Sequence, residues 1–124
     1  FLLHGVDVEF WKGHRHESKH IKILYTGVHL RDVDMLGAVI QSLLGRELDI
    51  CFRLLVPVYR RTHPVFASLQ NNPRVEWCAG LSDEALRDLY ATSTLMFLPL
   101  INSGANTAVV EAMAMGLPLL TTDV

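Results

Sequence analysis

Five short apolar runs that do not alternate with polar residues are the feature that most constrains how this chain folds. In a strand with one solvent-exposed face, apolar and polar residues alternate, whereas a strand covered by helices on both faces is apolar throughout. Helical patterns separate these runs. The alternation predicts an α/β fold, a doubly wound Rossmann-like parallel sheet. The expected strands are Ile21–Thr26, Ile50–Val56, Arg74–Cys78, Leu95–Ile101 and Leu117–Thr122.

The segments between the runs carry helix start and stop signals. Ser82 is the expected cap of a helix to Tyr90 with two acids in its first turn, and Thr62 the expected cap of a helix to Gln70. Asp32–Leu44 has apolar residues at helical spacing, and Gly116 is placed to end the last helix in a left-handed conformation. We expect strand order 3-2-1-4-5, with the ligand site at the carboxyl ends of strands 1 and 4.

Length and charge exclude several classes of function. The chain has 124 residues and a net charge of −2, so one domain is expected and nucleic acid is not an expected partner. No apolar run approaches the roughly 20 residues of a membrane-spanning helix. Cys51 and Cys78 have no metal-ligand spacing, and we interpret them as buried thiols in a reducing, cytoplasmic compartment.

The ends of the chain indicate a piece of a longer protein. Residues 1–20 are expected to be a connector, and residues 21–124 an incomplete Rossmann-like domain that stops directly after a strand. Uncovered apolar faces would then favour self-association. His16 and His20 stand four apart, which allows a metal pair on a helix, but the surrounding Lys and Arg favour a solvated linker.

Glu111 is a lone carboxylate in the apolar segment Ala108–Met115. Such a group is costly unless it reaches water or hydrogen-bond donors. Helical side chains lean toward the amino terminus, so Glu111 should point back toward the turn that precedes its helix. It either accepts hydrogen bonds from ligand hydroxyls or is a structural Glu near a helix start.

Three loops should meet a ligand at the switch point. After strand 1, Gly27 allows close approach of the backbone, and His29 and Arg31 offer donors to a phosphate, although a plain turn would look similar. After strand 4, the amides of residues 104–107 are available to a pyrophosphate. After strand 3, residues 79–82 would flank a flat base. No Gly-x-Gly-x-x-Gly or Walker sequence is present, which argues against a dinucleotide cofactor or ATP hydrolysis.

Two stretches, Leu81–Pro99 and Ser103–Val124, resemble the donor-binding half of family 4 retaining glycosyltransferases, which have the GT-B fold. The run Glu111–Pro118 carries the most specific likeness, and His4–Phe10 is similar to the segment where that family's chain enters its C-terminal domain. The resemblance covers nearly the whole chain.

The resemblance implies a site for a nucleotide-sugar, which is a substrate, with no separate cofactor and no metal. In that site Glu111 would hold the ribose hydroxyls, and Arg31 would be the basic group for the diphosphate. The base would lie by Gly80 and Leu81. Taken together, the loop residues and the resemblance give these candidate donor-binding residues: Gly27, His29, Arg31, Gly80, Leu81, Ser103, Gly104, Ala105, Asn106, Thr107 and Glu111.

Two positions depart from the family pattern. Val28 stands where the family usually has Arg, and Ser103 stands where it has the first of two acids, the one beside the transferred sugar. No catalytic residue is therefore assigned.

The leading interpretation is part of a hexosyltransferase-type enzyme, with the acceptor bound by an N-terminal domain of the parent chain. That parent is expected in the cytoplasm or at the inner membrane face, and the segment alone is expected to transfer no sugar. A doubly wound interaction or regulatory domain and a nucleotide-sugar epimerase are the alternatives.

Overall fold

The sheet has the predicted strand order. The computed structural model describes residues 20–27, 29–102 and 107–122. In this part of the chain, five parallel strands lie in the order β3-β2-β1-β4-β5. They are β1 (Ile21–Thr26), β2 (Ile50–Leu55), β3 (Val75–Cys78), β4 (Leu95–Leu98) and β5 (Leu119–Thr121). The α/β Rossmann-like fold is confirmed.

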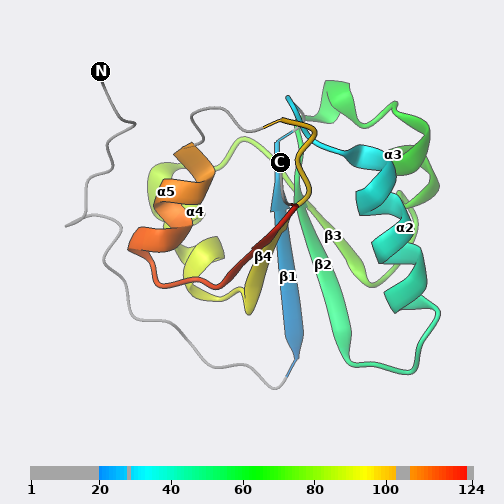
Figure 1. Cartoon of the computed structure of the whole chain (residues 1–124), viewed down its shortest axis with the longest axis horizontal. Helices are drawn as coiled ribbons and strands as arrows, with labels where there is room; N and C mark the ends of the chain where they lie inside the picture. Colours follow the sequence, from blue (N-terminus) through cyan, green and yellow to red (C-terminus); the bar gives the residue numbers. More distant parts are fainter. Residues whose placement is uncertain (1–19, 28, 103–106, 123–124) are drawn as a thin grey trace.

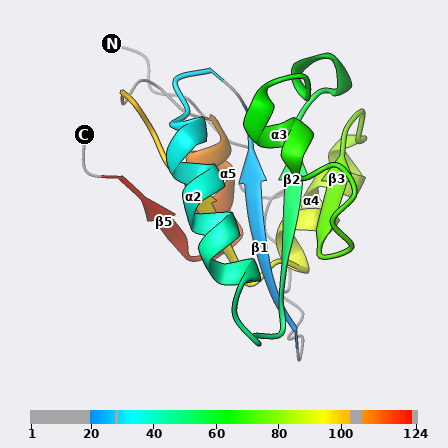
Figure 2. The same ribbon diagram turned by 90° about the vertical axis from the view of Figure 1, so that its right-hand side faces the viewer.

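Helices cover both faces of the sheet, as its apolar strands require. Helices α2 (Val33–Leu44) and α3 (Pro64–Ser68) lie on one face, and α4 (Asp83–Ala91) and α5 (Thr107–Ala114) lie on the other (Figure 1, Figure 2). A short 3-10 helix, η1 (Val58–Arg60), follows β2. The carboxyl ends of the strands therefore meet at one edge of a three-layered molecule.

The core lies around the central strands β1, β2 and β4. Leu24, Tyr25, Phe52 and Leu54 are fully buried. Helix α2 contributes Leu36 and Ile40, strand β4 contributes Met96 and Leu98, and further buried side chains outside the sheet include Phe66, Leu69, Leu89 and Tyr90. Burial of such side chains is the main favourable contribution to the stability of the fold.

Of the two predicted caps, Ser82 is confirmed and Thr62 is wrong, and the structure adds Asp32 as the cap of α2. Asp32 accepts a hydrogen bond from Met35 N at 3.0 Å, and Ser82 accepts one from Ala85 N at 3.1 Å. Helix α3, by contrast, is capped by His63, whose Nδ1 accepts from Val65 N at 3.1 Å, and not by Thr62. Pro64 explains the difference, because a proline is preorganised for the first helical position and has no N–H to satisfy.

Four strands are shorter than the predicted runs, and one of them, β3, begins at Val75 instead of Arg74. β2 ends at Leu55, β4 ends at Leu98, and β5 spans only Leu119–Thr121. Apart from Thr122, each missing part contains or adjoins a proline, Pro57, Pro73, Pro99 or Pro118. Proline has no N–H to donate to the ladder, so regular pairing is interrupted there although the neighbouring residues stay apolar.

The described residues contain no helix long and apolar enough to cross a bilayer, and no group of potential metal ligands. Both cysteines are free and half-buried, near opposite ends of their strands β2 and β3. His20 pairs with Asp49 through Nδ1 at 2.6 Å. Residues 1–19 of the expected connector, including His16, lie outside the described residues, so the hypothesis of a histidine pair stays a prediction.

Helix α5 ends as predicted at Gly116, which has φ +69°. Gly116 N donates to Met113 O at 3.1 Å, and Leu117 N donates to Ala112 O at 2.9 Å. These two bonds form a Schellman motif, which satisfies carbonyls that the helix end leaves free.

We expect Gly116→Ala to destabilise the chain by about 1 kcal/mol or more, because a Cβ is disfavoured in the left-handed region. Gly45→Ala is the matched control. Gly45 also follows a helix, but it has φ −75°, so alanine there should be neutral or slightly stabilising. Thermal unfolding of the two variants measures the difference. Equal losses of stability in the two variants would contradict a role for the positive φ of Gly116.

Candidate functional site

The loops after β1 and β4 are joined at the carboxyl edge of the sheet. Ile101 N donates to Leu30 O at 2.9 Å, and Asp32 N donates to Pro99 O at 2.8 Å. An isolated antiparallel bridge between Arg31 and Leu100 lies between these bonds. β1 and β4 are neighbours whose next partners lie on opposite sides, so this is the point where strand order reverses. The predicted convergence of the two loops is confirmed.

Arg31 is folded back onto its own loop. Its Nε donates to Thr26 O and its Nη1 to His29 O, both at 2.9 Å. A Cβ on Gly27, which has φ +89°, would lie 2.8 Å from Arg31 Nη2, so the glycine makes room for the guanidinium. Burial lowers the pKa of Arg31, while the hydroxyls of Tyr25 and Tyr90 act in the opposite direction. Arg31 thus shapes the loop and keeps further N–H groups for a ligand.

Glu111 is held by a phenol rather than by a cation. Tyr90 donates its hydroxyl to Glu111 Oε1 at 3.0 Å from the adjacent helix α4. Burial raises the pKa of Glu111, the bond from Tyr90 lowers it, and the charge of Asp83 raises it further. No Lys or Arg in the described residues forms an ion pair with Glu111, and its Oε2 accepts no hydrogen bond there. A half-buried carboxylate thus retains unused acceptor capacity.

Burial also raises the pKa of two phenols near this edge. Tyr90 is buried and faces Glu111, whose negative charge adds to the effect of burial. Tyr25 is fully buried, and its hydroxyl has no hydrogen-bond partner in the described part of the chain. Both phenols therefore stay neutral, so Tyr90 is a hydrogen-bond donor to Glu111 and not a competing charge.

The predicted residues Ser103, Gly104, Ala105 and Asn106 lie outside the described residues, as does Val28. Thr107 is the first residue of α5, and Glu111 follows one turn later on the same side of the helix. The start of α5 comes after the loop of β4, at the edge where Arg31 also lies.

A pocket of about 480 Å³ opens at the carboxyl ends of β1, β2 and β3. Gly27 contributes one wall, and Gly80, with φ +64°, contributes another. Leu81 is 38% exposed beside it but does not line it. The lining residues are Thr26, Gly27, Leu55, Pro57, Val58, Tyr59, Ala79 and Gly80.

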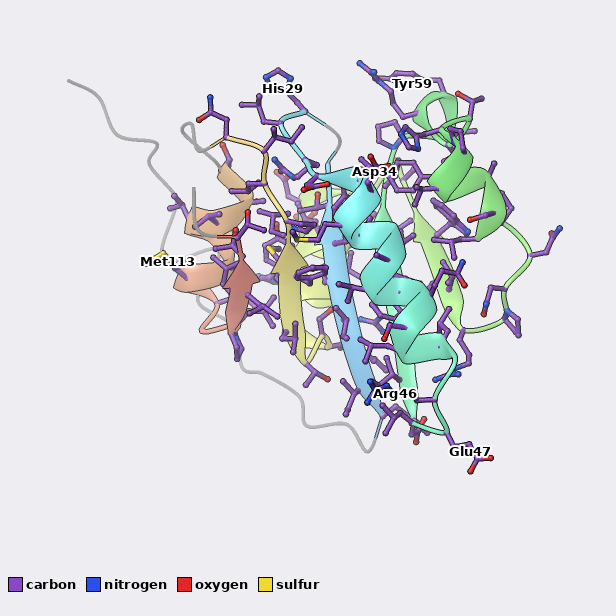
Figure 3. All side chains as sticks on the ribbon, turned by 45° about the vertical axis from the view of Figure 1, so that its right-hand side comes forward. His29, Asp34, Arg46, Glu47, Tyr59 and Met113 are labelled. Atoms are coloured by element: carbon purple, nitrogen blue, oxygen red, sulfur yellow. The ribbon has the colours of Figure 1, made fainter. Side chains whose placement is uncertain are left out.

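This pocket lies on the β2 side of the switch point, and the predicted site did not include the loop after β2. That loop carries Val58 and Tyr59 on η1, both largely exposed. Figure 3 shows Tyr59 and His29 at the same upper edge of the molecule, opposite Arg46 and Glu47. The signal available in the sequence was an aromatic residue two positions after the proline that follows a buried strand.

Comparison with known proteins identifies similar folds. A family model described as glycosyl transferases group 1 matches residues 20–124. A search of curated proteins gave no match. A sucrose-phosphate synthase from Thermosynechococcus elongatus has a TM-score of 0.72 and 15% identity, with 94% of this chain and 33% of that chain covered.

Two further solved structures show the same fold. The C-terminal domain of a glycosyl transferase group 1 family protein (LpcC) from Francisella tularensis has a TM-score of 0.71 and 11% identity over 94% of this chain and 70% of that chain. The catalytic domain of starch synthase IV from Arabidopsis thaliana, bound to ADP and acarbose, has a TM-score of 0.62 and 21% identity, covering 85% and 22%. The chain spans only 22% to 33% of several of the chains it resembles.

We expect the free energy of unfolding of the Glu111→Gln variant, relative to that of the unchanged chain, to increase as pH rises from acid to neutral. The pKa of Glu111 in the folded chain is raised above its ordinary value of 4.5, so folding favours the protonated acid. That contribution is complete at low pH and is lost as pH rises through the raised pKa. Gln removes the titration and still accepts a bond from Tyr90.

Urea unfolding of both forms at acidic and at neutral pH measures this difference. Glu47→Gln, which removes an exposed acid from the loop between α2 and β2, is the control for loss of one negative charge. A Gln variant that loses stability at neutral pH would show that the charge of Glu111 supports the fold.

Proposed function

The chain belongs to the group 1 glycosyl transferase family, and on that premise we propose that its carboxyl edge binds the nucleoside diphosphate of a sugar donor. The observation that carries the proposal is the state of Glu111. Its carboxylate is half-buried, and among the described residues its one hydrogen bond comes from a neutral phenol while Oε2 accepts none. The two hydroxyls of a ribose are donors suited to such a group.

Positive charge for the diphosphate comes from the neighbouring loop. Arg31 is oriented by its bonds to Thr26 O and His29 O, and helix α5 directs the positive end of its dipole toward the same edge. In a transfer reaction these groups would stabilise the leaving diphosphate electrostatically. Gly27 permits the close packing that this arrangement needs.

The base fits the pocket between Gly27 and Gly80, which offers main-chain groups and apolar walls. The starch synthase structure, whose fold is similar, contains ADP, and this supports a nucleoside diphosphate as the ligand class. Leu81, exposed beside the pocket, and His29, at the same upper edge of the molecule, complete the proposed donor site. The loop of residues 103–106 is proposed to meet the diphosphate or sugar through its amides.

We propose that the reaction is hexosyl transfer from a nucleotide-sugar to an acceptor held by another domain, with this segment alone unable to transfer sugar. Family membership favours transfer over the interaction-domain and epimerase alternatives. The donor is the substrate, and no separate cofactor or metal is part of the proposal. Ser103, in place of an acid, would bring a hydroxyl and not a carboxylate to the sugar.

Calorimetry with UDP, GDP and ADP tests the donor site. We expect weak binding of at least one nucleotide, and roughly 10- to 150-fold weaker binding by Glu111→Gln, because hydrogen bonds to a charged acceptor are lost. Glu47→Gln should bind as the unchanged chain does. Failure of all three nucleotides to bind at millimolar concentration, both to this chain and to its parent, would refute the proposal.

Self-association stays a prediction. Leu120 on the edge strand β5 is 59% exposed, and Met113 on the neighbouring helix α5 is 70% exposed. An unpaired strand edge with apolar side chains favours contact with a second copy. Light scattering over a range of concentrations should show growth in mass, and a constant monomer mass would contradict it.

A further inference from the structure

Tyr59 is a large aromatic side chain that the fold leaves in solvent. It is 75% exposed, although it lies only a few residues beyond the buried end of β2. It lines the pocket that also contains Gly27 and Gly80, so it belongs to the rim of the proposed donor site. None of the packing that fixes the core uses this ring.

The loop that carries Tyr59 is nonetheless held firmly by the next residues. Arg61 donates Nε to Val56 O at 3.0 Å and Nη2 to Cys78 O at 3.4 Å. These carbonyls lie at the ends of the adjacent strands β2 and β3. The Arg61 guanidinium also lies 4.9 Å from the centroid of the Trp77 ring, a cation–π contact. Arg61 therefore ties the Tyr59 loop to the loop of Gly80.

The lining of the pocket beside Tyr59 is suited to a flat, uncharged ligand. None of the described residues that line it carries a charge, and its side-chain polar groups are the hydroxyls of Thr26 and Tyr59. Such a lining suits the face of an uncharged ring, and the main chain of Ala79 and Gly80 borders the same pocket. Arg60 lies 5.7 Å from the centroid of the Tyr59 ring and adds a second cation–π contact beside it.

We propose that Tyr59 is the stacking platform for the nucleoside base of the donor, with Arg61 as its positioning residue. The inference rests on the proposed function and extends it to a residue of the loop after β2. Base–aromatic stacking accepts every base, because each has a π face. Tyr59 thus supplies affinity for the base, and selection among bases is left to the main chain of residues 79 and 80.

The test compares a ligand that has a base with one that lacks it. Tyr59→Ala should weaken binding of ADP, GDP and UDP to the chain by roughly 5- to 150-fold, the range that stacking contributes. It should leave ribose 5-phosphate binding unchanged. Tyr59→Phe keeps the ring and should bind the nucleotides as the unchanged chain does. Arg61→Met should weaken the binding of nucleotides and have little effect on the binding of ribose 5-phosphate.

A neighbouring pocket of about 500 Å³ provides the matched control, because Thr62 lines it together with Tyr59 and does not line the donor pocket. Thr62→Ala should leave nucleotide binding unchanged. The inference is overturned if Tyr59→Ala binds ADP normally, if it weakens ribose 5-phosphate equally, or if Thr62→Ala has the same effect. Failure of the unchanged chain to bind nucleotide removes the donor site itself, so the two failures are distinguishable.

Discussion

The central strand β1 is paired with β2 on one side and with β4 on the other, and this reversal of strand order decides where the chain can hold a ligand. The connections on the two sides run to opposite faces of the sheet, so the loops that follow β1 and β4 separate above it. Here they are tied together by the bonds Ile101 N to Leu30 O and Asp32 N to Pro99 O. The geometry of the site therefore depends on main-chain hydrogen bonds between two loops and not on side chains alone.

That arrangement places two charged groups in different environments. Arg31 donates two hydrogen bonds to carbonyls of its own loop and is half-buried against Gly27. Glu111 lies on a helix of the other layer with the Tyr90 hydroxyl as its partner. A direct ion pair between the two would have cancelled both charges. Keeping them in separate contacts preserves a cation for the phosphates and an acceptor for the hydroxyls of the proposed ligand.

The loop after β2 adds a third wall to this edge. Arg61 joins the ends of β2 and β3, and the exposed ring of Tyr59 is carried on the same short segment. Because the pocket beside it has no charged lining residue among those described, the edge divides into an uncharged part over β2 and a charged part over β1 and β4. A nucleoside diphosphate has the same division, with a flat base at one end and an anionic group at the other.

The amino-acid sequence by itself determined the α/β class, the strand order, the cap of α4 and the glycine that ends α5, because these depend on local periodicity and local backbone preference. It also singled out Glu111 and Arg31 from their residue types and positions. Only the tertiary structure decided that Tyr90 is the partner of Glu111, 21 residues away, and that Arg31 bonds its own loop. The ends of β2 and β3 and the ring of Tyr59 form one pocket only after the sheet assembles, since no sequence spacing encodes contacts between separate strands. The cap of α3 has a local cause instead: Pro64 occupies the first helical position, which makes His63 the cap in place of Thr62.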